Sequence, residues 1–269
     1  MWYRASTHMR CLIAAALPRG DQEAHVSATP SPELFQLDPR LDTAALAALY
    51  RPNQRLHVRG LLAPAGAQAL YSHLAEEVQW SLALNDGTQA REATPAQRRQ
   101  FEPGRELELA AFAYEGARQG FQFLYERQSV PEDPAARVSE PTLLNRFVDF
   151  LNSPPFIAFA RTVTGASDIE WADAQATRYG PGHFLTRHDD SSGAHNRRVA
   201  YVVNLTPEWN TDWGGLLQFI DQEGHVARAY APRFNAINLF SVPQAHAVSV
   251  VAPFAAWPRY SVTGWLRTR

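Results

Sequence analysis

The spacing of hydrophobic residues divides the chain into a helical first half and a strand-rich second half. Apolar residues recur at four-residue steps at Leu70, Leu74 and Val78, which predicts an amphipathic helix from Pro64 to Val78. Similar patterns predict helices over 42–50, 106–126, 141–152 and 154–164, and short strands over 55–62, 79–84 and 89–93. From Ile169 onwards, Val-, Ile-, Phe-, Tyr- and Thr-rich segments alternate with turns. The strands expected there are 170–178, 184–189, 198–205, 216–221, 226–231, 236–240, 245–250 and 260–266.

Eight closely spaced strands after a set of helices favour an α+β fold, in which helices buttress a β barrel or sandwich. We expect one domain over 34–269, with a helical support over about 34–168 and a β core over about 169–269. Gly214 and Gly215 precede a strand and predict a close approach of two backbones. Residues 1–33 are rich in Ala, Ser and Pro and predict a disordered tail. The apolar run 11–17 is at the short limit for a signal peptide and has no clear cleavage site after it.

The composition excludes several kinds of chemistry. The net charge of −2 gives no bulk attraction to nucleic acid or membrane, and no apolar stretch approaches the length of a membrane span. All 25 basic residues are arginines, so lysine Schiff-base chemistry is excluded and a charged anion site must use arginine or a protonated histidine. The one cysteine, Cys11, excludes an internal disulfide and cysteine-rich zinc sites. We therefore expect a cytoplasmic protein that binds neither nucleic acid nor membrane.

The most specific chemical signal is the set His188, Asp190, His246 and Arg259. Residues two apart on a strand point to the same face, so His188 and Asp190 can bind one metal ion together, in preference to Asp189. His246, on a later strand, can complete two histidines and one carboxylate, the facial triad of non-haem Fe(II) oxygenases. Arg259 suits a carboxylate-bearing cosubstrate because its planar fork binds carboxylates bidentately.

Other residue patterns have more ordinary readings. His183, His195 and His225 lie in turns or at strand ends, where we expect solvated side chains. The pair Arg197 and Arg198 is expected to be solvated, with a substrate contact as the alternative. The aromatics of the expected helix 106–126, which are Phe112, Tyr114, Phe121, Phe123 and Tyr125, are expected to be packing residues.

Four stretches together resemble the prolyl-hydroxylase-like 2-oxoglutarate/Fe(II) dioxygenases, nearest the ribosomal prolyl hydroxylase branch. They are RYGPGHFLTRHDD, RRVAYVVNLTPEWNTDWGGLLQFID, PRFNAINLFSVPQAHAVSVV and PRYSVTGWLRTR, and the likeness extends over about 35–269 through GFQFLYERQSVP. The resemblance implies a distorted double-stranded β-helix, or jelly-roll barrel. It also implies Fe(II), 2-oxoglutarate and O2 as cofactors, with ascorbate as a reductant.

Carried over to this chain, the resemblance makes His188, Asp190 and His246 the iron ligands and catalytic residues. Arg259, where collagen-type relatives use lysine, would bind the distal carboxylate of 2-oxoglutarate. Ser261 and Tyr179 would help to hold the same cosubstrate. Asn204 is expected to face inward, without an assigned role.

The resemblance implies an oxidoreductase that hydroxylates a prolyl residue of a protein or peptide. Alternatives are a hydroxylase of a free amino acid or small metabolite, a metal-free β-barrel binding module, and a zinc hydrolase. Eukaryotic ribosomal-type relatives carry a second barrel, whereas one is predicted here, which leaves the substrate open. The segments 130–141 and 193–197 are candidates for covering a substrate.

Overall fold

A computed structural model describes residues 34–191 and 196–269 of the chain, and the predicted tail over 1–33 lies outside them. Most helices lie in the first half, as the hydrophobic spacing predicts. The helices are α1 (Thr43–Tyr50), α2 (Pro64–Glu76), α3 (Pro95–Arg98), α4 (Arg105–Gln119), α5 (Pro134–Ser139), α6 (Leu143–Leu151) and α7 (Pro154–Thr164). A short 3-10 turn follows at Thr211–Trp213. In the described part of the chain, no helix has the length and hydropathy that crossing a bilayer requires.

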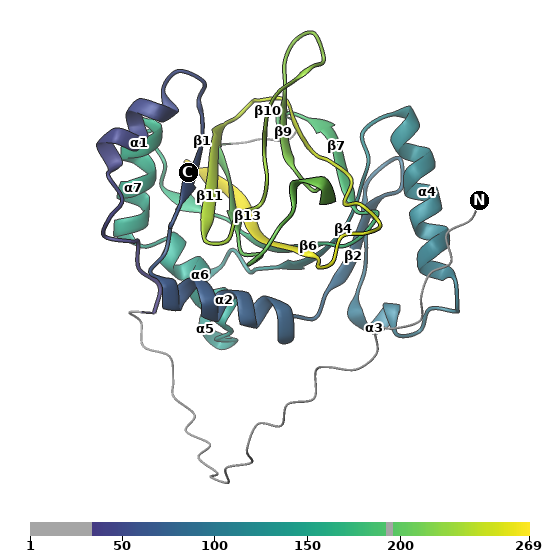
Figure 1. Cartoon of the computed structure of the whole chain (residues 1–269). Coiled ribbons are helices and arrows are strands. Elements are labelled where there is room, and N and C mark those ends of the chain that lie inside the picture. The colour runs from purple at the N-terminus through teal and green to yellow at the C-terminus, as the bar shows by residue number, and fades with distance from the viewer. Residues whose placement is uncertain (1–33, 192–195) are drawn as a thin grey trace, which may run out of the picture. The chain divides into compact units, whose positions relative to one another are not determined.

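The strands form one antiparallel sheet that curls into a nearly closed barrel (Figure 1). Along the sheet the order is β1-β11-β8-β13-β6-β4-β7-β12-β9-β10, with the β2–β3 hairpin on β4 and β5 on β13. The strands are β1 (Arg55–Arg59), β2 (Ser81–Asn85), β3 (Ala90–Ala93), β4 (Phe123–Ser129), β5 (Trp171–Ala172), β6 (Gln175–Tyr179), β7 (Phe184–His188), β8 (Arg197–Asn204), β9 (Leu217–Ile220), β10 (Val226–Tyr230), β11 (Ala236–Ser241), β12 (His246–Val248) and β13 (Arg259–Arg267). The expected α+β fold with a double-stranded β-helix is confirmed.

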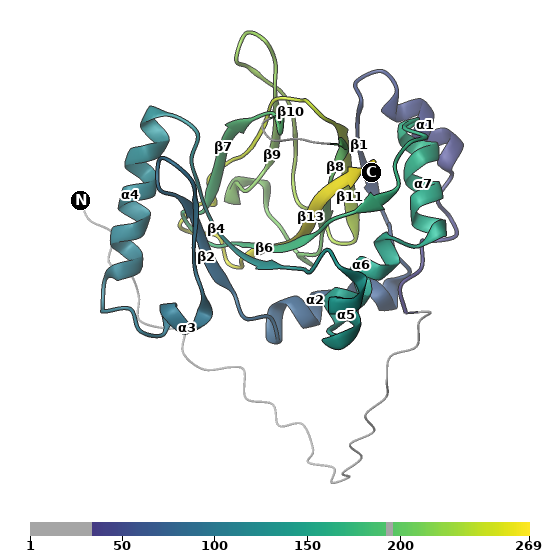
Figure 2. The ribbon, with the colours of Figure 1, turned by 180° about the vertical axis from the view of Figure 1, so that it is seen from behind.

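The helices cover the outside of the sheet, as both ribbon views show (Figures 1 and 2). The largest buried cluster contains side chains of α2, α6 and α7 together with alternate residues of the central strands. On β8, Val199, Tyr201 and Val203 belong to this outer core. Ala200 and Val202 belong instead to a second cluster inside the barrel. Strand alternation thus separates a helix-facing layer from an inward-facing layer, and the inward layer is where the candidate site lies.

Two strands from the first half of the chain complete the barrel. β1 pairs with β11, while β4 pairs with β6 over Glu126–Ser129 and with β7 over Phe123–Leu124. At the two ends of the sheet, β1 and β10 meet through side chains, because the His57 ring stacks on Tyr230 with centroids 5.2 Å apart. Residues before 169 therefore provide part of the barrel as well as its helical support.

Two element predictions in the first half are wrong. The expected helix 106–126 ends at Gln119, because Gly120 interrupts it, and Phe123–Ser129 is a strand. The aromatics Phe121, Phe123 and Tyr125 recur at steps of two, which is the period of a strand. The expected loop 130–141 contains α5, which Asp133 caps by accepting the amide of Ala135.

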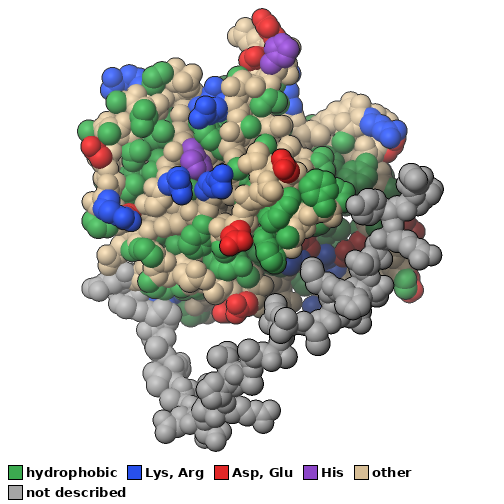
Figure 3. Space-filling model, viewed as in Figure 1, with side chains coloured by type: hydrophobic (Ala, Val, Ile, Leu, Met, Phe, Trp, Pro, Cys, Tyr) green, Lys and Arg blue, Asp and Glu red, His purple; other side chains and the backbone are tan. Residues whose placement is uncertain are grey.

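Charged side chains are mixed over the surface. On the face shown in Figure 3, acidic and basic groups are spread among hydrophobic and polar ones, without a continuous field of one sign. This distribution agrees with the net charge of −2 and gives no sign of bulk electrostatic attraction on that face.

Candidate metal and cosubstrate site

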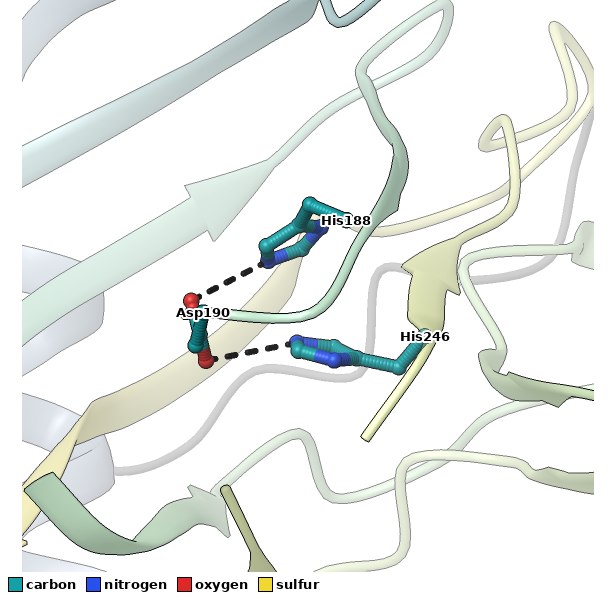
Figure 4. Close-up of side chains that lie close together, drawn as sticks. All are labelled: His188, Asp190 and His246. Atoms are coloured by element: carbon teal, nitrogen blue, oxygen red, sulfur yellow. Dashed lines mark ion pairs between the residues drawn. The ribbon is translucent and has the colours of Figure 1, made fainter. Parts of the chain in front are cut away.

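The structure brings His188, Asp190 and His246 together at one end of the barrel interior (Figure 4). His188 is the last residue of β7, and His246 is the first residue of β12. These two residues are direct cross-strand partners, and their ring centroids lie 4.0 Å apart. Asp190 follows β7 by two residues and turns its carboxylate toward both rings. One potential ligand atom from each residue lies within 4.8 Å of the others, so all three can contact one ion.

Backbone carbonyls fix the tautomers of both histidines. Nδ1 of His188 lies 3.0 Å from the Thr186 carbonyl oxygen, and Nδ1 of His246 lies 2.8 Å from the Gln244 carbonyl oxygen. Because a carbonyl oxygen can only accept, each Nδ1 must carry the proton and donate it. The Nε2 atoms therefore present lone pairs, 3.5 Å and 3.7 Å from the two carboxylate oxygens of Asp190. Hydrogen bonding of the distal ring nitrogen is the usual support of a metal-ligating histidine.

Burial prepares His246 to act as a ligand. Removal from water lowers the pKa of His246 to about 4, and the neighbouring His188 ring contributes in the same direction. The His246 ring is thus neutral at neutral pH, the form that binds a metal. Two imidazoles and a carboxylate suit a divalent transition metal and leave further coordination positions open.

The carboxylate reaches this site by a different route from the one that strand alternation predicts. β7 ends at His188, so Asp190 is not a strand residue. The φ angle of Asp190 is 63°, in the left-handed region that few residues other than glycine, asparagine and aspartate adopt. Asp189 is exposed and accepts hydrogen bonds from Ser191. The structure thus places the carboxylate of Asp190, and not that of Asp189, beside the two rings, and the turn after the strand is the physical reason.

Arg259 lies deeper in the same cavity, as the first residue of β13. Its side chain is 2% exposed, and the nearest polar contact is 3.5 Å, from Nη2 to Oδ1 of Asn204. Nε and Nη1 are buried without a hydrogen-bond partner among the described residues. Burial lowers the pKa of Arg259, yet an arginine keeps its charge in proteins. A buried cation without a carboxylate partner is costly, so this site fits an anionic ligand, and a planar carboxylate matches the guanidinium fork.

The other residues predicted for cosubstrate binding surround Arg259. Ser261, two residues on along β13, is buried, and its hydroxyl lies 2.8 Å from that of Thr177. Tyr179 is the cross-strand partner of Arg259, and its ring centroid lies 5.3 Å from the guanidinium carbon. Burial raises the pKa of Tyr179, so its hydroxyl stays protonated and can donate a hydrogen bond. Asn204 faces inward as expected, and its contact with Arg259 now suggests a role.

Apart from Asn204, these groups line one cavity of about 200 Å³. Its wall is mostly apolar and aromatic. The lining residues are Phe121, Phe123, Tyr125, Gln175, Thr177, Tyr179, Leu185, His188, Asp190, Ala200, Val202, Leu217, Phe240, His246, Val248, Arg259, Ser261, Thr263, Gly264 and Trp265. Phe121 and Tyr125 were expected to be packing residues of a helix. The two-residue spacing of 121, 123 and 125 is the signal that predicts an extended segment facing the site, in which Phe121 lies just before β4.

The structure places the other histidines and the Arg197–Arg198 pair in different environments, only some of which match the expectation. His225 is exposed, as expected, but His183 is half-buried and accepts the amide of Gly180 through Nδ1, so a solvated role is wrong for it. Arg198 is an exposed partner of Asp168, whereas Arg197 packs on the ring of Trp265. His195 and the expected covering residues 193–195 lie outside the described part of the chain.

The segment 130–141 packs away from the site. Arg137 of α5 is buried and donates to Asp149 of α6, and no residue of this segment lines the cavity. This placement contradicts its expected role as a cover over the substrate.

Comparisons with known proteins place this arrangement in a family. The sequence profile of the 2OG-Fe(II) oxygenase superfamily matches residues 174–267, a range that contains the triad and Arg259. The chain is 28% identical over 147 residues to prolyl 3,4-dihydroxylase OGFOD1 of Ostreococcus tauri, and 30% identical over 117 residues to prolyl 3-hydroxylase OGFOD1 of Xenopus laevis. These alignments cover 50% and 41% of this chain. Residues 174–267 thus match the 2OG-Fe(II) oxygenase superfamily, and the chain is similar to prolyl hydroxylases.

The solved structures add evidence on the fold. A prolyl-4-hydroxylase from Pseudomonas putida superimposes with a TM-score of 0.51 and 16% identity, over 85% of this chain and 93% of that one. At this identity the likeness concerns the fold alone. The aligned segment spans 28% of the Ostreococcus protein and 22% of the Xenopus protein. The chain thus matches less than a third of the length of each of these longer relatives.

Proposed function

We propose that this protein is an Fe(II)- and 2-oxoglutarate-dependent dioxygenase that hydroxylates a prolyl residue in a protein or peptide. The observation that carries the proposal is the presence, in one cavity, of a two-histidine, one-carboxylate set and a buried arginine without an acidic partner. The first suits Fe(II), and the second suits the distal carboxylate of 2-oxoglutarate. When bound, the iron and the 2-oxo acid supply O2-dependent oxidation coupled to decarboxylation.

In this proposal each residue of the candidate site has a defined task. His188, Asp190 and His246 hold the metal through the two Nε2 atoms and the carboxylate. Arg259 binds and orients the cosubstrate through Nε and Nη1, which have no other partner among the described residues. Tyr179 and Ser261 offer hydroxyl groups beside it, and the apolar lining of the cavity limits the access of water.

The charges of the cavity favour a peptide over a free amino acid. Among the described lining residues, Asp190 and Arg259 are the acidic and basic ones, and both have tasks in the proposal. Burial keeps His246 neutral. A free amino acid would bring an ammonium and a carboxylate into this cavity without partners for them, which is unfavourable. A prolyl residue within a chain carries neither charge.

Phe121 supplies an apolar contact for such a residue. Its side chain is 49% exposed, and its ring centroid lies 5.5 Å from that of the His188 ring. An exposed aromatic next to a metal ligand can pack against the aliphatic ring of a proline. Phe121 therefore lies where a substrate contact is needed.

The test combines two readouts. Purified protein, Fe(II) and 2-oxoglutarate are incubated with a library of proline-containing peptides or with free L-proline, and succinate is quantified while mass spectrometry detects a gain of one oxygen. We expect peptide-dependent succinate and hydroxyproline, with Phe121→Ala weakening the apparent affinity for peptide but not for 2-oxoglutarate. Turnover of free proline or another small metabolite, with no reaction of any peptide, would support the small-molecule alternative.

Metal analysis separates the remaining alternatives. A metal-free binding module would contain no iron, and a zinc hydrolase would need neither O2 nor 2-oxoglutarate. Ascorbate as a reductant and a cytoplasmic location remain part of the proposal. The location is supported by the single cysteine, which excludes an internal disulfide.

A further inference from the structure

Trp265 and Arg197 form a closed set of contacts with Asp190. The indole Nε1 of Trp265, on β13, donates to Oδ2 of Asp190 at 3.1 Å. The guanidinium carbon of Arg197, at the start of β8, lies 3.5 Å from the centroid of the Trp265 ring. Nη1 of Arg197 also donates to the main-chain carbonyl of Asp190 at 3.3 Å. Side chain and main chain of the carboxylate residue are thus held by two different strands.

Asp190 needs such support more than the two histidines do. His188 and His246 lie on paired strands, and their positions follow from the ladder of the sheet. Asp190 lies beyond the end of β7 in a left-handed conformation, which is disfavoured and persists only where the surroundings impose it. The contacts from Trp265 and Arg197 are of the kind that can impose it.

The contacts of the Asp190 carboxylate leave room for an ion. An indole N–H can only donate, so it supports an oxygen that accepts. This oxygen, Oδ2, is also the one that lies 3.7 Å from Nε2 of His246, while Oδ1 lies 3.5 Å from Nε2 of His188. A carboxylate oxygen has two lone pairs, so Trp265 can occupy one and leave the other for an ion. Arg197, whose guanidinium carbon lies over the indole, packs against the ring and restricts its orientation.

We propose that Trp265 and Arg197 are positioning residues that hold the Asp190 carboxylate ready for the metal. This inference rests on the proposed metal site and adds to it the reason why an aspartate outside the strand can complete the triad. Partners of this outer kind typically contribute tenfold to a hundredfold to metal affinity. A simple packing role for Trp265 would depend on the ring and not on its N–H group.

The experiment measures Co(II) binding by full-length protein, by calorimetry and by the visible absorption of the bound ion. Trp265→Phe keeps an aromatic ring and removes the donor, and Arg197→Lys keeps the charge and removes the planar group. The matched controls are Trp257→Phe, an exposed tryptophan, and Arg198→Lys, the exposed neighbour of Arg197 that pairs with Asp168. Melting temperatures of the metal-free proteins are recorded for each variant.

We expect Trp265→Phe to weaken Co(II) binding by about tenfold to a hundredfold and to shift the absorption of the bound ion, with an unchanged melting temperature. Arg197→Lys should act in the same direction, and both controls should match the wild type. Wild-type affinity and absorption in Trp265→Phe would overturn the inference and leave the proposed function standing. If the wild type binds no Co(II), the proposed metal site itself is wrong and the inference falls with it. If Trp265→Phe does not fold, the comparison of Arg197→Lys with Arg198→Lys tests the inference by the same Co(II) affinity and visible absorption.

Discussion

Arg259 and Tyr179 are cross-strand partners, and the guanidinium carbon of Arg259 lies 5.3 Å from the centre of the Tyr179 ring. An aromatic face and the amide oxygen of Asn204 are thus the contacts that the described residues offer to this buried cation. A ring face stabilises a cation less than a carboxylate does. The site therefore carries an electrostatic cost that an anionic ligand removes.

The first prediction follows from this cost. Arg259→Met removes the charge while keeping most of the packing volume, so we expect the metal-free, ligand-free protein to melt at the same or a higher temperature than the wild type. The same change should raise the Michaelis constant for 2-oxoglutarate by roughly one to three orders of magnitude, because its carboxylate loses a buried partner. Metal affinity should change little. Ser261→Ala is the comparison, and its effect should be smaller because the Ser261 hydroxyl already contacts Thr177. An unchanged Michaelis constant in Arg259→Met would contradict the assignment.

The second prediction concerns the triad. Anaerobic titration of the wild type should give one Fe(II) per chain, and His246→Ala should weaken binding by more than about a hundredfold, which is the upper limit for loss of an outer partner. Turnover should be lost with it. His225→Ala is a suitable control because His225 is exposed. Full activity of His246→Ala would show that another group completes the metal site.

The third prediction concerns the close backbone approach at Gly214, which the sequence predicts and the structure contains. Its φ is 66°, and an added Cβ would lie 2.0 Å from the carbonyl oxygen of Val250. We expect Gly214→Ala to lower the free energy of unfolding by about 2–4 kcal/mol, because strain and overlap act together. Gly87 has a φ of 95° and nothing within 4 Å of such a Cβ. Gly87→Ala is therefore the matched control, and it should lower the free energy of unfolding by only about 1 kcal/mol. Equal losses in urea denaturation of the two variants would exclude the overlap.

The fourth prediction uses the buried Glu126 on β4. Burial opposes its ionisation, but hydrogen bonds and charges of Arg178 and Arg98 outweigh burial and lower the pKa of Glu126 below the ordinary value of 4.5. A lowered carboxyl pKa gives stability that is complete above the unfolded-state value and is lost as the pH falls through the folded-state value. We therefore expect Glu126→Gln to lower the free energy of unfolding by about 1–3 kcal/mol at pH 7. This difference from wild type should shrink below about pH 4.5.

Denaturant titrations from pH 7 to pH 3 measure this difference. Glu106→Gln is the control, because Glu106 is the 52%-exposed partner of Arg98 and should contribute little. A difference between Glu126→Gln and wild type that stays constant down to pH 3 would rule out the linkage.

The sequence predicted most of the candidate site because its chemistry is local and its residues are of distinctive types. The expected helices 42–50 and 154–164 also match the structure, where Asp42 caps the start of α1 and Gly165 the end of α7. The spacing of His188, Asp190 and His246 indicated a metal set, although the turn that presents Asp190 depends on contacts with Trp265 and Arg197 from other strands. Such non-local contacts leave no periodic trace in a sequence.

Tertiary context also explains the failures. Apolar residues continue past Gly120 and extend the helical pattern, although Phe121, Phe123 and Tyr125 also have the two-residue spacing of a strand. His183 looks like an ordinary turn residue, yet the fold half-buries it and gives its ring the amide of Gly180. The burial of His183 could not be predicted without knowing which strands lie beside it, whereas the two-residue spacing around Phe123 is visible in the sequence.

The position of β13 has a consequence for how the protein is made. This strand, the last in the described chain, lies in the middle of the sheet between β8 and β6. During synthesis, strands from the earlier part of the chain must therefore wait for residues 259–267 before the sheet can join. The same residues carry Arg259, Ser261 and Trp265 into the cavity. Completion of the barrel and assembly of the anion pocket are thus one event in folding, so an unfinished chain would not present the cosubstrate with its arginine.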